Sequence, residues 1–259
     1  MRVYAFHAGG EGGDMAAFDP FDPNVGTAID IPFFFFLIDH PDGKVLFDTG
    51  AHPDFASDPR LRLGNEADNW DIRIQAGDDV VSRIATLGLA ATDITHVVQS
   101  HLHYDHAGGI EFFPHAPVYI HRDELAFAFA PPVYQQGVYV RADFDVPGVR
   151  WVELDGEHDL FGDGRVIVFP TPGHSKGHQS MMVHLAGRTV ILLSDAAYLV
   201  EKMRARALPA GALAWSPDAM VASWERIEAL ERQHDALLVA THDLKYRERT
   251  RLAPDAWYE

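Results

Sequence analysis

The sequence of 259 residues contains no cysteine. Disulfide bonds and thiolate metal ligands are therefore excluded, and any bound metal ion must be held by histidine and carboxylate side chains. Because a chain without cysteine is compatible with both oxidising and reducing compartments, this absence does not place the protein in either.

Basic residues are also scarce. Lysine and arginine number 21 against 38 aspartates and glutamates, which gives a formal net charge of −17. Such a charge repels phosphate groups, so the composition argues against a nucleic-acid partner and against binding to an anionic membrane surface.

Long apolar segments are missing as well. The longest apolar run, residues 31–38, includes Pro32 and is far shorter than the ~20 residues that a helix needs to cross a bilayer. The apolar stretch of residues 1–7 is too short for a signal peptide and leads directly into glycines. We therefore expect a soluble cytoplasmic protein without a membrane segment.

The rest of the composition, 47% hydrophobic and 23% charged, is that of an ordinary globular protein. No low-complexity linker divides the chain, so we expect a single domain over residues 1–259. Hydrophobic patterns predict strands at residues 2–8, 29–39, 44–48, 94–98, 118–121, 165–169, 179–184, 188–193 and 236–240. They predict helices at residues 78–88, at residues 122–129, and from Ser216 onward. The glycine-rich residues 9–13 are interpreted as a loop, residues 131–144 as an excursion from the core, and residues 51–77 have no clear pattern.

Candidate metal ligands follow the strand predicted at residues 94–98. His101, His103, Asp105 and His106 lie within six residues of one another. The alternative is a polar loop with hydrated histidines, but three imidazoles and a carboxylate in so short a span are typical of a metal site. If the chain turns into a helix near Asp105, these side chains surround one point instead of lying in a row.

Three more residues of ligand type, His174, Asp195 and His242, also follow predicted strands. We therefore expect all seven side chains to meet at one edge of a sandwich of sheets. Seven nitrogen and oxygen ligands are too many for one tetrahedral zinc ion and suit two metal ions that share a carboxylate. Asp195 is the natural bridge, because a carboxylate offers two oxygens.

Other polar residues near these motifs have weaker signals. His178 is interpreted as a hydrogen-bonded neighbour of the ligands rather than a ligand, and Asp48 and Asp243 as residues that orient ligand histidines. The remaining histidines are interpreted as surface or hydrogen-bonded core residues: His7, His40, His52, His96, His115, His121, His158, His184 and His234.

The chain resembles the metallo-β-lactamase superfamily, and the matching motifs are spread over most of its length. They are Asp48-Thr49-Gly50, the segment from His101 to Gly109, Thr171-Pro172-Gly173-His174, Asp195 and His242. Within the superfamily the chain is most similar to the N-acyl-homoserine lactone lactonases, which degrade bacterial quorum signals. The most discriminating marker is Tyr198, three residues after Asp195. The resemblance implies an α/β protein with the four-layer αβ/βα sandwich of this superfamily.

The resemblance also implies a site with two divalent metal ions, of which zinc is the first choice and iron, cobalt or manganese are compatible with the ligands. It places one ion on His101, His103 and His174, and the other on Asp105, His106 and His242. Asp195 and a hydroxide bridge the two ions, and this hydroxide attacks the carbonyl of a small-molecule lactone, foremost an N-acyl-L-homoserine lactone.

Two residues have further roles in this mechanism. Tyr198 polarises the lactone carbonyl, and Asp105 shuttles a proton to the leaving alkoxide. The alternative for Tyr198 is ordinary packing at the start of a helix. Residues 21, 55, 70 and 134, all aromatic, are candidates for the acyl-chain pocket, and the family resemblance is compatible with a homodimer.

Other functions stay open on the same fold. They are a lactonase of the pyridoxolactonase type, a thioesterase like glyoxalase II, a β-lactamase, a phosphodiesterase, and a metal-binding protein without activity. The charge of −17 argues against a phosphodiesterase acting on RNA. A diiron oxidoreductase is excluded, because no residues are left for a flavin-binding domain.

Overall fold

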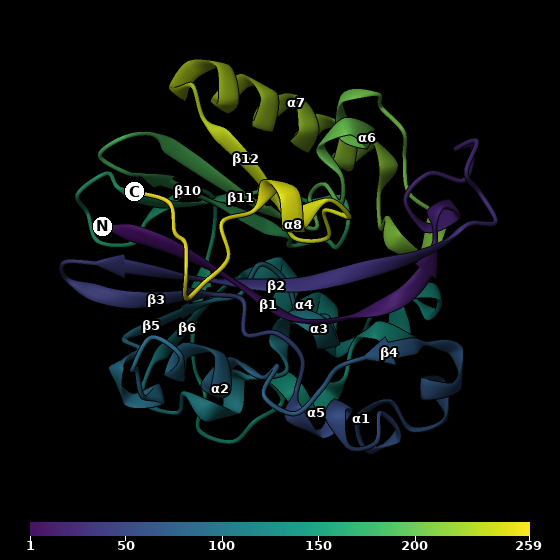
Figure 1. Ribbon diagram of the computed structural model, residues 1–259, viewed down its shortest axis with the longest axis horizontal. Helices are drawn as coiled ribbons and strands as arrows, with labels where there is room; N and C mark the ends of the chain where they lie inside the picture. The colour runs from purple at the N-terminus through teal and green to yellow at the C-terminus, as the bar shows by residue number, and fades with distance from the viewer.

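The computed structural model of the protein describes residues 1–259 and contains two facing β-sheets with helices on the outer side of each (Figure 1). The seven-stranded sheet has the order β4-β1-β2-β3-β5-β6-β7, and the five-stranded sheet has the order β12-β11-β10-β9-β8. This arrangement confirms the predicted αβ/βα sandwich.

The strands of the larger sheet are β1 (Arg2–Asp14), β2 (Ala28–His40), β3 (Gly43–Phe47), β4 (Asp71–Arg73), β5 (His96–Val98), β6 (Pro117–His121) and β7 (Arg150–Leu154). Those of the smaller sheet are β8 (His158–Asp159), β9 (Val166–Pro170), β10 (Gln179–His184), β11 (Thr189–Ser194) and β12 (Leu237–Ala240). The α-helices are α1 (Arg60–Leu63), α2 (Val80–Ala85), α3 (Tyr104–Ala107), α4 (Arg122–Phe129), α5 (Arg141–Phe144), α6 (Val200–Arg204), α7 (Pro217–His234) and α8 (Tyr246–Arg249). Short 3₁₀ helices are η1 (Met15–Ala17), η2 (Pro53–Ala56), η3 (Gly64–Asn69), η4 (Ala91–Asp93), η5 (Ile110–Phe112), η6 (Val133–Val138) and η7 (Gly211–Leu213). None of the helices is both long enough and apolar enough to span a membrane.

The phenylalanine-rich strand β2 is buried on both faces, which explains its continuous apolar run. Side chains alternate along a strand, so Phe34 and Phe36 enter the core between the two sheets together with residues of β9 and β10. Phe35 and Leu37 point the other way, into the core beneath α2 and α4. Burial of this kind contributes about 25 cal/mol per Å² of apolar surface.

Helix α7 covers the outer face of the smaller sheet (Figure 1). Its stripe of Met220, Trp224 and Ile227 packs on that sheet, as its helical spacing predicts. The side chain of Ser216 caps the helix by accepting a hydrogen bond from the amide of Ala219, which confirms the predicted start.

Residues 9–13 form part of β1, so their interpretation as a loop is wrong. They pair with β2 on one side and with β4 on the other. Gly9 has a φ of +82° beside a shift in register, and a Cβ on Gly10 would lie 2.3 Å from the carbonyl oxygen of Ile31. Glycine therefore serves here to allow a bulge and close strand pairing rather than to end the strand.

Other expectations need smaller corrections. The helix expected at residues 78–88 is confined to α2, and the strand expected at residues 94–98 begins at His96. Strands β4, β7 and β8 were not predicted, because they are short or mixed in polarity and are defined by pairing with neighbours.

Arg62 of α1 connects residues 51–77 to residues elsewhere in the chain through hydrogen bonds. Its guanidinium donates hydrogen bonds to Asp54 at 2.9 Å, to Glu111 at 3.1 Å and to Asp143 at 3.1 Å. The side chain of Arg62 is 10% exposed and that of Asp143 is fully buried. Burial raises the pKa of Asp143 to about 7, although the guanidinium of Arg62 lowers it. One buried cation thus holds a segment that contributes Trp70 to the cavity described below.

Candidate metal centre

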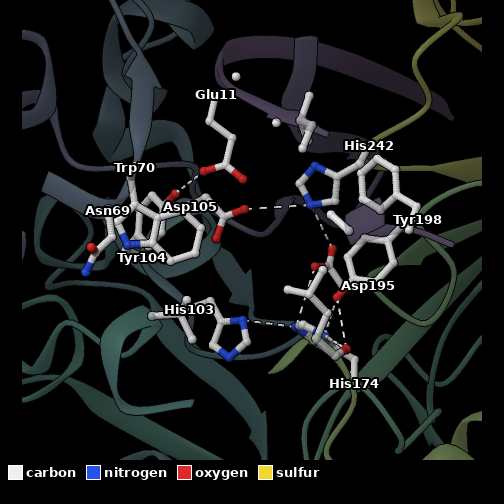
Figure 2. A pocket seen from close by; sticks show the side chains of 17 residues that line it. Glu11, Asn69, Trp70, His103, Tyr104, Asp105, His174, Asp195, Tyr198 and His242 are labelled. Atoms are coloured by element: carbon white, nitrogen blue, oxygen red, sulfur yellow. Dashed lines mark hydrogen bonds and ion pairs between the residues drawn. The ribbon is translucent and has the colours of Figure 1, made fainter. Parts of the chain in front are cut away.

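The structure brings all seven predicted ligand residues together at one edge of the sandwich. The loop after β5 supplies His101 and His103, and helix α3, which follows it, supplies Asp105 and His106. The loop after β9 supplies His174. Asp195 and His242 directly follow the parallel strands β11 and β12. Figure 2 shows side chains from these elements pointing toward a common centre. The predicted convergence of strand ends is confirmed.

Three imidazoles form the first group. His174 Nε2 lies 3.1 Å from His101 Nε2 and 3.0 Å from His103 Nδ1, and all three side chains are buried. On its outer side the ring of His101 is hydrogen-bonded through Nδ1 to the Ser100 hydroxyl at 2.9 Å. Three ring nitrogens thus face one point, which is the ligand set that the resemblance implies for one of the two metal ions.

One carboxylate and two imidazoles form the second group. Its ligand-type atoms come from Asp105, His106 and His242 and lie within 4.8 Å of one another. Asp195 lies between the two groups: Oδ1 is 3.3 Å from His106 Nε2 and 3.2 Å from His242 Nε2, and Oδ2 is 3.5 Å from His174 Nε2. This position between both groups is the one that a bridging carboxylate needs.

The hydrogen-bond partners of the histidines indicate which ring nitrogens can face a cation. Three of the rings donate a hydrogen bond from Nδ1 on their outer side. His106 donates to the Asp48 carboxylate at 2.9 Å. His174 donates to the Leu213 carbonyl at 2.9 Å, and His242 donates to the Pro32 carbonyl at 2.8 Å. In its neutral form each of these imidazoles carries its one proton on Nδ1 and presents an Nε2 lone pair to the inside, where a metal ion can bind. The buried His106 Nε2 and Asp195 Oδ1 have no hydrogen-bond partner. Lone pairs and a carboxylate oxygen repel one another, and a metal ion between them removes this repulsion.

The pKa shifts follow the same division. Burial and the neighbouring imidazoles hold the pKa values of His101 and His103 well below the usual value, so these rings stay neutral. Burial also lowers the pKa of His106, but the carboxylates of Asp105 and Asp195 outweigh it and raise this pKa well above its usual value. The first group therefore offers neutral nitrogen ligands, and the second attracts positive charge.

Asp48 and His178 hold the ligands in place, as expected. Asp48 accepts hydrogen bonds from His106 Nδ1 at 2.9 Å and from the amide of Ser100 at 2.7 Å. His178 is bonded through Nδ1 to Thr171, and its Nε2 accepts a hydrogen bond from the amide of Asp195 at 3.1 Å. The expectation for Asp243 is wrong: its carboxylate accepts hydrogen bonds from the Lys245 amide and from Arg249, and none from a histidine.

The nine remaining histidines lie outside the cluster, as expected. His40, for example, is buried and hydrogen-bonded to Asp163 at 3.0 Å, and His7 stacks on Tyr246.

A cavity of about 200 Å³ opens next to the cluster. Trp70 lines it, as expected, together with apolar residues such as Phe18 and Leu213. The expectation fails for the other three aromatic candidates. Phe21 is 95% and Tyr134 49% exposed away from the cavity, and Phe55 is buried behind the ring of Tyr104.

Tyr198 also lines the cavity. Its hydroxyl lies 2.5 Å from His174 Nδ1 and 3.2 Å from the carbonyl oxygen of Leu213, to which it donates a hydrogen bond. Burial raises the pKa of Tyr198 well above its usual value, so the hydroxyl keeps its proton. The structure thus places a proton donor at the cavity, next to the three-imidazole group.

Glu124 of α4 was missed by the sequence analysis. Its fully buried carboxylate accepts hydrogen bonds from the Leu102 amide, the Tyr139 hydroxyl, the Ser175 hydroxyl and the Gly177 amide, at 3.2, 2.9, 2.6 and 3.1 Å. It therefore ties the loop between β5 and α3 to the loop that follows β9. A single glutamate in a short helix has no local pattern that marks it as buried, so no sequence signal could have found it.

Residues 34–242 match the family described as the metallo-beta-lactamase superfamily. The chain belongs to this superfamily. A similar member is N-acyl homoserine lactonase AttM of Rhizobium radiobacter, which is 39% identical over 90% of this chain and 86% of its own length. Among solved structures of the superfamily fold, an N-acyl homoserine lactone hydrolase with N-hexanoyl-L-homoserine at its catalytic metal centre has a TM-score of 0.86 at 22% identity, over 98% of both chains. AidC, described as a dizinc quorum-quenching lactonase, has a TM-score of 0.69 at 17% identity, over 93% of this chain and 86% of its own.

Proposed function

We propose that this protein is a metal-dependent hydrolase that opens the ring of N-acyl-L-homoserine lactones. The observation that carries the proposal is the convergence of five histidines and two aspartates at one edge of the sandwich, where the buried His103 Nε2, His106 Nε2 and Asp195 Oδ1 have no hydrogen-bond partner in the protein. The 39% identity to a lactonase over 90% of the chain supports the choice of substrate. An apolar cavity beside the cluster suits the acyl chain of such a lactone.

The residues present fit two metal ions, and zinc suits them well. His101, His103 and His174 would hold one ion, Asp105, His106 and His242 the other, and Asp195 would contact both. Bound metal ions would supply Lewis acidity, which polarises an ester carbonyl and makes water more acidic.

The remaining chemistry belongs to side chains of this protein. Ring opening adds a water oxygen to the lactone carbonyl carbon and breaks the bond from that carbon to the ring oxygen. The Tyr198 hydroxyl donates a hydrogen bond to the carbonyl oxygen while negative charge develops on it. Asp105, whose side chain reaches the cavity, passes a proton to the ring oxygen as it leaves. The product is an acyl-homoserine with one new carboxylate and one new hydroxyl group.

Replacing Tyr198 by phenylalanine is expected to lower kcat for lactone hydrolysis about 10- to 100-fold. Removal of one oxyanion donor typically costs 10²–10³-fold. The loss is smaller here, because the Tyr198 hydroxyl must first leave the Leu213 carbonyl, a hydrogen bond that contributes about 1 kcal/mol. The decrease in kcat is measured by steady-state kinetics of Tyr198→Phe, on protein whose metal content equals that of the wild type. An unchanged kcat would remove Tyr198 from the reaction.

The function itself is tested with purified protein whose metal content is known from elemental analysis. In a pH-stat, N-hexanoyl-L-homoserine lactone should release one proton per ring opened, and removal of metal with a chelator should abolish this release. Readdition of zinc should restore it. Rapid cleavage of a glutathione thioester without lactone hydrolysis would instead support the thioesterase that the fold also permits.

A further inference from the structure

Glu11 of β1 is the one carboxylate on the cavity wall that lies outside the seven-residue cluster. Its Oε2 accepts a hydrogen bond of 2.7 Å from the Tyr104 hydroxyl. Figure 2 shows its other oxygen directed into the cavity, where it has no hydrogen-bond partner in the protein. The strand around Glu11 pairs with β2 and with β4, so its backbone is held on both sides.

An acceptor without a partner discriminates between ligands. A ligand that fills the cavity and brings a hydrogen-bond donor satisfies the free oxygen of Glu11. A ligand without a donor leaves it desolvated and unpaired, which is unfavourable for a carboxylate. The cavity wall also contains apolar residues, such as Phe18 and Ile31, whose phenyl and aliphatic side chains offer no hydrogen-bond donor to Glu11. Glu11 therefore selects for a donor at one position.

An N-acyl-homoserine lactone with an unsubstituted acyl chain has one hydrogen-bond donor, the amide N–H that joins ring and acyl chain. Its two carbonyl groups and its ring oxygen are acceptors, which a carboxylate does not bind. We propose that Glu11 is a specificity-determining residue that accepts the hydrogen bond of the substrate amide N–H, with Tyr104 holding the carboxylate in position. The inference rests on the proposed lactonase function and identifies how the enzyme distinguishes acyl-amide lactones from simple lactones.

Two matched substrates test this inference. One is N-hexanoyl-L-homoserine lactone, and the other is α-(2-oxoheptyl)-γ-butyrolactone, in which a CH₂ replaces the amide N–H. Both are assayed at pH 8, above the pKa of about 7 to which burial raises Glu11. Glu11→Met should lower kcat/KM for the amide about 10- to 100-fold, mainly through KM, because a hydrogen bond to a charged group is lost. The same variant should raise kcat/KM for the CH₂ analogue at least about fivefold, because it removes a carboxylate that this substrate leaves desolvated and unpaired.

Glu11→Gln, which keeps an acceptor oxygen, should recover part of the loss, and Tyr104→Phe should give an intermediate loss for the amide alone. Glu153→Met, at an exposed site on β7, is the matched control and should behave as the wild type. Metal content and thermal unfolding of each variant report on folding. An equal loss for both substrates in Glu11→Met would overturn the inference. A wild-type protein that hydrolyses neither lactone would overturn the proposed function instead.

Discussion

Replacing Asp195 by alanine is expected to strip the protein of bound metal and to lower lactone hydrolysis by at least about 10³-fold. Asp195 has carboxylate oxygens within 3.5 Å of ligand nitrogens in both groups, Oδ1 beside His106 and His242 and Oδ2 beside His174. Its removal leaves the lone pairs of His106 and His242 without the anion that balances a second cation. Lewis-acid stabilisation is worth several kcal/mol, and each 1.36 kcal/mol is a factor of ten in rate.

The measurements for Asp195→Ala are metal bound per chain, by elemental analysis, and the initial rate in the pH-stat. Asp155→Asn is the matched control, because Asp155 pairs with Arg122 at an exposed site and should leave both values unchanged. A variant that keeps two metal ions per chain and hydrolyses lactone at the wild-type rate would contradict the role of Asp195 as the shared ligand.

Replacing Arg62 by methionine is expected to lower the free energy of unfolding by about 3–5 kcal/mol at pH 8. Methionine fills much of the same volume but leaves the buried carboxylate of Asp143 without its counter-charge, and removal of one partner from a buried ion pair typically has this cost. Arg60→Met is the matched control. Arg60 pairs with Asp68 at the surface, with both side chains more than half exposed, and such pairs contribute about 0–1 kcal/mol.

The loss in Arg62→Met should depend on pH with a defined sign. The folded-state pKa of Asp143, about 7, lies above the value of 3.8 usual for an aspartate. The contribution of Asp143 to the free energy of unfolding is therefore fully present below about pH 4 and is lost as the pH rises through 7. Without Arg62 the carboxyl resists ionisation even more, so the variant should be closer to the wild type at pH 5.5 than at pH 8. Urea unfolding at both pH values measures the difference, and a loss that is larger at pH 5.5 would contradict this account.

Local sequence patterns predicted the parts of the site that follow strands. The segment from His101 to His106 repeats ligand-type residues at short spacing, and the apolar run before it marks a strand end. Position at strand ends therefore located His174, Asp195 and His242 as well. Helix α4 and the hairpin of β10 and β11 were also predicted, because their patterns are strong within a few residues.

Sequence patterns failed where tertiary contacts outweigh local preference. Residues 9–13 look like a loop because glycine is rare in strands, yet pairing on both sides makes them part of β1. That error left the position of Glu11 unpredicted, because its place on the cavity wall depends on the pairing of β1 with β2 and β4. Phe21 was expected in the pocket because it is aromatic, but it is exposed, since nothing in its type fixes the direction of its side chain.

By itself the sequence determined the superfamily, the identity of the seven ligand-type residues and the exclusion of thiolate ligands. Only the tertiary structure decided that Asp195 lies between the two groups, that Glu124 joins the ligand loops, that Arg62 holds residues 51–77, and that Glu11 meets Tyr104. The reason is that ligand motifs are local in the chain. Partly buried hydrogen bonds between residues 11 and 104, or 62 and 143, join positions far apart in sequence and leave no pattern along it.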